Sequence, residues 1–259
     1  MSGIEVRNLR KTFGHRGDVV ALDGVSFAVE QGGALGLIGE SGSGKSTTAR
    51  ILLGLERPTS GSILRDGVPY EPWRVSGRER LERARSMQIV FQDPYLSLNP
   101  RMRVIDAVRA AAELHGLSSF DARARARHIL DEVGLGVREG ESVPRSLSGG
   151  QRQRAAIARA LAVSPRFVIL DEAVAALDVS VQAQILNLLN ELRRAEGVGY
   201  LFITHNLAVV RYVTDDAVVL HHGRVVERGP TARILSKPDH PYTRALLAAV
   251  PGGIPREEF

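Results

Sequence analysis

The stretch Gly39-Glu40-Ser41-Gly42-Ser43-Gly44-Lys45-Ser46 decides the fold of this chain. It has the spacing GxxxxGK[ST], follows an apolar run at residues 34–38 and precedes a helix-forming run that starts at Thr47. Glycines let successive main-chain N–H groups turn toward phosphate oxygens, and a helix start adds its positive dipole end. Lys45 can reach the β- and γ-phosphates of a nucleotide, and the Ser46 hydroxyl can bind Mg²⁺. A Gly-Ser linker would not end in Lys-Ser-Thr at a helix start, so the stretch predicts a phosphate loop.

Alternating strand and helix patterns surround the phosphate loop on both sides. Between Gln92 and about residue 164 the sequence is instead Arg-rich and mostly helical in pattern. This organisation predicts an α/β sheet domain interrupted by a helical insert. The expected elements are strands at 4–7, 25–29, 34–38, 167–170 and 200–204, hairpins around Asp66-Gly67 and His222-Gly223, and helices at 47–55, 78–85, 121–133, 151–163 and 181–196.

The composition agrees with a globular protein that has an anionic partner. The 259 residues are 44% hydrophobic and 24% charged, which excludes collagen and disordered chains. The chain has no cysteine, which excludes thiol catalysis, Fe–S clusters and a disulfide scaffold. Lys11, Lys45 and Lys237 are the only lysines among 34 basic residues and the formal charge is +5, so arginine dominates a basic surface. Such a surface suggests nucleic acid, phosphate or a membrane face as the partner, and compositional bias is the alternative explanation.

No secretory leader is expected, and no apolar run approaches the ~20 residues of a membrane span.

Two further stretches carry chemistry. The apolar run at residues 167–170 ends in Asp171 and Glu172, which resembles a Walker B segment. Asp171 would hold Mg²⁺ and Glu172 would polarise the attacking water, although many strands simply end in acidic turns. Leu147-Ser148-Gly149-Gly150-Gln151, here called the signature segment, precedes a helix. It could be a second anion site or only a serine cap with flexible glycines.

The order of these segments resembles the ABC-type ATPases, because a signature segment stands between a phosphate loop and a Walker B strand. Gln92 resembles the Q-loop glutamine, Ala176-Leu177-Asp178 the D-loop and His205 the switch histidine. Phe13 lies where the family places an aromatic ring that stacks on adenine. In isolation, Gln92 would be a loop glutamine, His205 a solvated or capping histidine and Phe13 a core aromatic.

The resemblance implies a P-loop NTPase (RecA-like) core sheet with an N-terminal antiparallel β subdomain and an inserted helical subdomain. The implied division is 1–91 with 165–235 for the core, 92–164 for the helical signature subdomain and 236–259 for the C-terminal tail. The implied ligands are ATP and Mg²⁺. The implied sites are Glu172, His205 and Gln92 for catalysis, Phe13, Gly39, Ser41, Gly42, Gly44, Lys45, Ser46 and Thr47 for nucleotide binding, and Ser46, Gln92 and Asp171 for Mg²⁺. Two cassettes pair head to tail in this family, so Ser148, Gly149, Gly150, Gln151 and Asp178 would contact the nucleotide held by a partner.

Three stretches, at residues 91–100, 177–184 and 240–247, resemble the peptide/nickel-type importer branch. That branch implies two integral membrane permease subunits, a second ATPase subunit (the same chain or a paralogue) and, indirectly, a solute-binding protein. It also implies a peripheral location at the cytoplasmic face of the inner membrane and no nucleic acid partner. The sequence departs from the family at Ala173-Val174-Ala175, where a serine hydroxyl of the D-loop region is missing. The alternative is a soluble ABC ATPase that acts on nucleic acid or ribosomes. A P-loop kinase or GTPase would leave the signature segment and His205 unexplained.

Overall fold

The computed structural model describes residues 3–14, 19–74 and 76–249. The described residues of Met1–Ser76 and Gly197–Phe259 form one compact unit, here unit 1, and Gly77–Glu196 form another, unit 2. The C-terminal segment expected at 236–259 is described as far as residue 249, and residues 250–259 lie outside the described part. The division at 91/92 and 164/165 remains a prediction.

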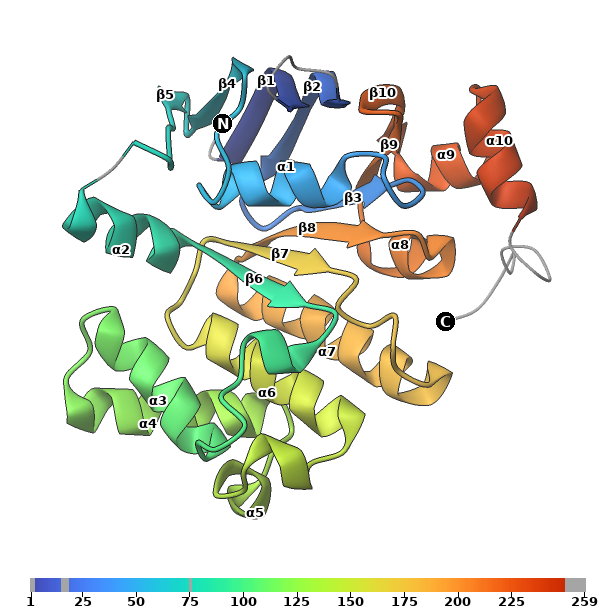
Figure 1. Ribbon diagram of the computed structural model, residues 1–259. Coiled ribbons are helices and arrows are strands. Elements are labelled where there is room, and N and C mark those ends of the chain that lie inside the picture. The colour runs from blue at the N-terminus through green and yellow to red at the C-terminus, as the bar shows by residue number, and fades with distance from the viewer. Residues whose placement is uncertain (1–2, 15–18, 75, 250–259) are drawn as a thin grey trace. The chain divides into compact units, whose positions relative to one another are not determined.

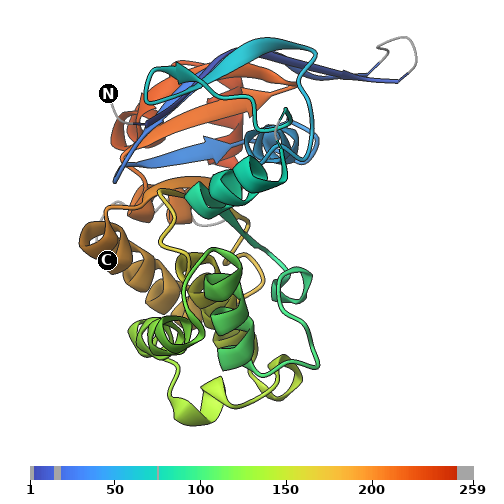
Figure 2. The ribbon, with the colours of Figure 1, turned by 90° about the vertical axis from the view of Figure 1, so that its left-hand side faces the viewer.

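Unit 1 contains an antiparallel sheet in the order β2-β1-β4-β5. Strands β1 (Gly3–Phe13) and β2 (Val19–Glu30) form its long ribbon, which Figure 2 shows in dark blue. Strands β4 (Ser60–Arg65) and β5 (Val68–Pro69) form the predicted hairpin. Its turn residues Asp66 and Gly67 both have positive φ (55° and 78°), as a type I′ turn requires.

The second set of strands in unit 1 has the order β10-β9-β3-β8. The fully buried strand β3 (Ala34–Ile38) lies parallel to β8 (Gly199–Thr204) on one side and to β9 (Asp216–His221) on the other. Strand β10 (Arg224–Pro230) pairs antiparallel with β9 across His222-Gly223, which confirms the second predicted hairpin. The carboxyl ends of β3 and β8 therefore meet at one edge, where the segments after both strands leave the sheet.

Four helices complete the described part of unit 1 (Figure 1). Helix α1 (Lys45–Leu52) ends earlier than expected. Gly54 has a φ of 73°, and the N–H groups of Gly54 and Leu55 donate back to the Ile51 and Arg50 carbonyls, which is a Schellman stop. Helices α8 (Leu207–Val213), α9 (Thr231–Ser236) and α10 (Pro241–Ala248) share an apolar cluster with β3 and β9.

Unit 2 contains two parallel strands and a group of helices (Figure 1). Strands β6 (Met87–Phe91) and β7 (Phe167–Asp171) pair side by side, and helix α6 (Gly149–Leu161) contacts β6, α3 (Val104–Leu114), α4 (Ser119–Glu132) and α7 (Val179–Glu196). Several small alanines of α6 are buried and let the neighbouring helices approach closely. The other elements of the unit are α2 (Gly77–Ser86), α5 (Val137–Gly140) and the 3₁₀ turns η1 (Pro94–Leu96) and η2 (Pro144–Ser146).

The helical character expected after Gln92 is confirmed. Within the part of the chain that the structure describes, no helix is both long and apolar enough to cross a bilayer.

Candidate functional site

The phosphate loop (residues 39–46) connects β3 to α1 in unit 1, as the sequence predicts. Gly42 and Gly44 have φ values of 81° and 108°, which L-residues rarely adopt. A Cβ on Gly44 would lie 2.6 Å from Leu22 Cδ2 and 2.7 Å from the Ala21 carbonyl oxygen. Both the backbone angle and the close neighbour therefore require glycine at position 44.

Lys45 is the buried cation of this loop. Its side chain is 7% exposed, and Nζ donates to the Gly39 carbonyl at 2.6 Å and the Glu40 carbonyl at 2.8 Å. Carbonyl oxygens are neutral acceptors, so an anionic phosphate oxygen would be a stronger acceptor for this ammonium group. The exposed Ser46 and the half-buried Thr47 follow in the first turn of α1, where N–H groups have no partner within the helix. The Lys45 ammonium and these N–H groups are suitable donors for the phosphates of a nucleoside triphosphate.

Phe13 and His205 also belong to unit 1. Phe13 ends β1, is 38% exposed and has the Lys11 ammonium 4.7 Å from its ring centroid. It is therefore accessible for stacking and is not the core aromatic of the alternative interpretation. His205 is exposed and directly follows β8. Ile38 pairs with Thr204, so Gly39 and His205 leave the sheet at the same edge.

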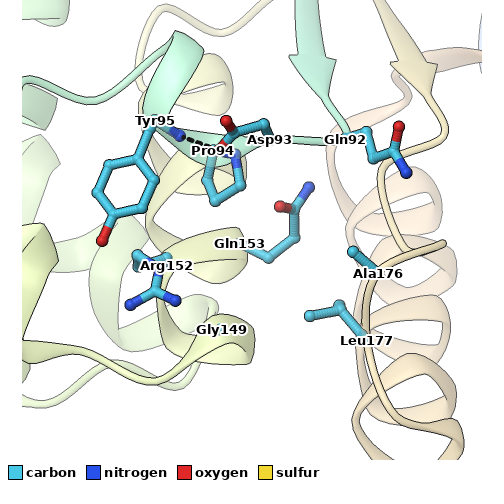
Figure 3. Close-up of a pocket in the computed structure, with 9 residues that line it drawn as sticks. All are labelled: Gln92, Asp93, Pro94, Tyr95, Gly149, Arg152, Gln153, Ala176 and Leu177. Atoms are coloured by element: carbon cyan, nitrogen blue, oxygen red, sulfur yellow. Dashed lines mark hydrogen bonds between the residues drawn. The ribbon is translucent and has the colours of Figure 1, made fainter.

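Unit 2 brings three predicted segments to one cavity of about 330 Å³. Figure 3 shows the loop after β6 on one side, the start of α6 below it and the D-loop opposite. The lining residues are Gln92, Asp93, Pro94, Tyr95, Gly149, Arg152, Gln153, Ala176 and Leu177. The Q-loop, the signature segment and the D-loop are thus neighbours within this unit, although they are far apart in sequence.

The signature segment opens α6 with a complete capping box. Ser148 Oγ accepts from the Gln151 N–H at 3.2 Å, and Gln151 Oε1 accepts from the Ser148 N–H at 3.0 Å. The serine is therefore a helix cap, and its exposed hydroxyl proton can still be donated to an incoming oxygen. A Cβ on Gly150 would lie 2.5 Å from Val181 Cγ1, so glycine lets the first turn of α6 approach α7.

The two candidate carboxylates stand at the end of β7. Asp171 is its last residue and pairs with Phe91, so Glu172 and Gln92 leave neighbouring strand ends. Glu172 has a φ of 49°, a left-handed conformation that costs a non-glycine residue roughly 1–2 kcal/mol. Such strain is concentrated at functional sites, which agrees with the role expected for this side chain.

Asp178 of the D-loop has a structural contact of its own. Its Oδ1 accepts from the Val181 N–H at 3.0 Å and from the Ser180 hydroxyl at 2.8 Å. The hydrogen bond from Val181, followed by that from Ser180, holds the pKa of this exposed carboxyl below its ordinary value. The structure therefore places Asp178 as the cap of α7, and the expected contact across a dimer remains a prediction.

No metal cluster is preformed among residues 3–14, 19–74 and 76–249, where no three His, Cys, Asp or Glu side chains gather. Magnesium in nucleotide sites usually takes one or two protein ligands beside phosphate oxygens and water. A hydroxyl, a carboxylate and an amide oxygen are suitable ligands of this kind. The assignment of Ser46, Gln92 and Asp171 to Mg²⁺ therefore remains a prediction.

Sequence reasoning missed Gln153. This side chain is 1% exposed, and its Nε2 donates to the Phe91 carbonyl at 3.2 Å, directly before Gln92. Figure 3 shows Gln153 projecting from α6 into the space between the Q-loop and Ala176. A signal existed, because Gln153 occupies the same helix face as the buried Ile157 and Leu161, where a polar residue is unexpected.

The fold and these segments define an ATP-binding cassette. The family described as "ABC transporter" matches residues 22–175, more than half of the chain, so the chain belongs to this family of ATPases. The description "Oligopeptide/dipeptide transporter, C-terminal region" matches residues 226–258, which include the stretch at 240–247. The predicted family and branch are therefore confirmed.

Individual proteins that are similar to this chain agree with the family assignment. The chain is 45% identical over 251 residues to the oligopeptide transport ATP-binding protein OppF of Bacillus subtilis, covering 96% of this chain and 82% of that protein. It is 49% identical over 232 residues to a putative peptide import ATP-binding protein of Brucella abortus, covering 89% of this chain and 69% of that protein.

Solved structures confirm the predicted fold class. The structure of cbiO1 from Clostridium perfringens, part of the ABC transporter complex cbiONQ, has a TM-score of 0.81 at 28% identity and covers 96% of this chain and 95% of its own. The dimeric post-hydrolysis cassette MJ0796, bound to ADP and Pi, has a TM-score of 0.77 at 29% identity and covers 88% of this chain and 98% of its own.

Proposed function

We propose that this chain is the subunit that binds and hydrolyses ATP to power an importer of peptides or a similar small solute. The observation that carries the proposal is the buried Lys45 ammonium of the glycine-rich loop, whose Nζ donates to the Gly39 and Glu40 carbonyls beside the start of α1. The relatives named for peptide transport and peptide import support the substrate class. They do not favour the alternative of an ATPase that acts on nucleic acid or ribosomes.

We assign the roles in hydrolysis to residues of the phosphate loop and to residues at the ends of the neighbouring strands. Lys45, Ser46 and the N–H groups of the loop and of the first turn of α1 would bind the phosphates. When bound, Mg²⁺ neutralises charge on the phosphate oxygens, and Ser46, Gln92 and Asp171 would hold it. Glu172 would accept the proton of the attacking water, and His205 would orient the γ-phosphate. Phe13 would stack on the adenine ring.

The cassette would work as a pair. Ser148, with the amides of Gly149 and Gly150, would contact the nucleotide held by a second ATPase subunit, either the same chain or a paralogue. The dimeric cassette bound to ADP and Pi supports this arrangement for the family. The pair would dock on two membrane permease subunits at the cytoplasmic face of the inner membrane, and a solute-binding protein would deliver the cargo.

Transport into proteoliposomes tests this proposal. The chain is co-expressed with the two permease subunits encoded beside its own gene and reconstituted with the solute-binding protein encoded there. ATP-dependent peptide uptake is then measured. We expect uptake with the wild-type chain and none with Lys45→Ala, the matched control. Failure to assemble with any permease, together with tight salt-dependent binding of DNA by the purified chain, would refute the transport function.

A further inference from the structure

The C-terminal helix α10 contacts the phosphate loop through one tyrosine. The Glu40 N–H donates to the Tyr242 hydroxyl oxygen at 3.2 Å, although the two residues are 202 positions apart. Both residues lie in unit 1. Because this N–H points to Tyr242, it is not available to a phosphate, and the hydrogen bond instead fixes the main chain at the second position of the loop.

The ring of Tyr242 makes a second connection to the same loop. It stacks on His221 with ring centroids 3.8 Å apart and planes 22° apart. His221 ends β9, and the turn that follows it reaches the loop, because the Gly223 N–H donates to the Ser43 carbonyl at 3.0 Å. Tyr242 therefore contacts the phosphate loop directly at Glu40 and, through His221 and its turn, at Ser43.

The position of Tyr242 is set by groups outside the loop. His240 caps α10 by accepting the Tyr242 N–H on Nδ1 at 3.2 Å. The Glu227 carboxylate of β10 accepts the N–H groups of Asp239 and His240 at 2.9 and 3.1 Å. The Tyr242 ring also packs against the apolar cluster of β3, β9, α8 and α9. The tyrosine is thus held in place before any nucleotide arrives.

We propose that Tyr242 is a positioning residue that holds the phosphate loop in its nucleotide-receiving conformation and so makes ATP affinity depend on the docking of α10. Glycine-rich loops lose much conformational freedom on binding, and an element that orders the loop in advance lowers that entropic cost. The inference rests on the proposed function, since it concerns the same phosphate loop. It gives the stretch at 240–247 a physical role in the cassette.

ATP binding by variants of the full-length chain tests this inference. Tyr242→Phe keeps the ring on His221 and removes only the hydroxyl, and Tyr242→Ala removes both contacts. Tyr212→Phe is the matched control, because it removes a hydroxyl from a half-buried tyrosine of α8. Isothermal titration calorimetry with ATP gives the Kd for ATP, and steady-state hydrolysis gives the KM and kcat. Thermal unfolding without nucleotide gives the Tm of each variant.

Tyr242→Phe is expected to raise the Kd and KM for ATP by about 2- to 12-fold, the effect of one neutral hydrogen bond, with kcat and Tm near the wild-type values. Tyr242→Ala is expected to raise them further, and Tyr212→Phe to leave them unchanged. Wild-type ATP affinity in Tyr242→Phe would overturn the inference, as would a lowered Tm with unchanged Kd. If the wild-type chain bound ATP but drove no transport, the proposed function would fail while this inference would stand.

Discussion

Replacement of Gly44 by alanine, compared with the same change at Gly42, tests the conformation of the phosphate loop. Both glycines have positive φ, 108° at Gly44 and 81° at Gly42. They differ in their surroundings. A Cβ on Gly44 would lie 2.7 Å from the Ala21 carbonyl oxygen, which belongs to the backbone and cannot rotate away, whereas a Cβ on Gly42 would have no heavy atom within 4 Å.

The expected loss in the free energy of unfolding has two contributions, the strain of a positive φ and the crowding of the added methyl group. A positive φ costs an alanine about 1–2 kcal/mol at either position. Forcing a methyl group into occupied space costs about 1–3 kcal/mol more, and only Gly44 has that term. Gly44→Ala should therefore destabilise the protein by about 2–5 kcal/mol and Gly42→Ala by about 1–2 kcal/mol.

Urea unfolding followed by circular dichroism, without nucleotide, measures both values. We expect Gly44→Ala to unfold at a clearly lower urea concentration than Gly42→Ala, with similar slopes for the two variants. Equal midpoints would mean that the loop does not press against Ala21 in the free protein. The argument from crowding at Gly44 would then be wrong.

Two further predictions concern contacts that hold functional segments. Gln153→Leu should cost about 1–3 kcal/mol in urea unfolding because the Phe91 carbonyl loses its donor, and an unchanged midpoint would contradict this. Burial raises the pKa of Glu227, but the nearby Thr243 hydroxyl and the N–H groups of Asp239 and His240 lower it more, so the pKa lies below the ordinary 4.5. A lowered folded-state pKa contributes stability that is present above 4.5 and is lost as the pH falls through the folded value. Glu227→Gln should therefore lower the Tm at neutral pH and have little effect in strong acid, and an equal effect at both would rule out a role for the charge.

The local elements could be predicted wherever one residue type sets the backbone. Asp66-Gly67 and His222-Gly223 predicted hairpins because I′ turns need positive φ at both positions. The strand expected at 4–7 is longer in the structure, where β1 spans Gly3–Phe13. The alternation of side chains stops at the irregular register after Val6, where Asn8 has a φ of 48°, so the sequence pattern ends before the strand does. The helices expected to begin at 47 and 151 begin earlier in the structure, at Lys45 and Gly149. A charged residue and glycines at these starts do not extend the apolar periodicity from which a helix is predicted.

The candidate site could likewise be predicted only where its chemistry depends on residues adjacent in sequence. Motif order predicted the phosphate loop and the signature segment, since their chemistry is local. The hydrogen bonds from Gln153 to Phe91 and from Glu40 to Tyr242 could not be predicted, because they join residues 62 and 202 positions apart. Such contacts depend on tertiary packing. The helical period can mark Gln153 as a polar residue on a buried face, but it does not identify the distant partner in either hydrogen bond.

ATP turnover by Glu172→Gln is the most direct test that this chain is a cassette whose general base is Glu172. Hydrolysis is measured with Mg²⁺ and ATP, and light scattering reports the oligomeric state in the same samples. The loss of a general base typically costs about 10²- to 10⁴-fold in rate, so we expect turnover to fall by that factor and an ATP-bound dimer to accumulate. Turnover at the wild-type rate, with no dimer in ATP, would contradict the assignment.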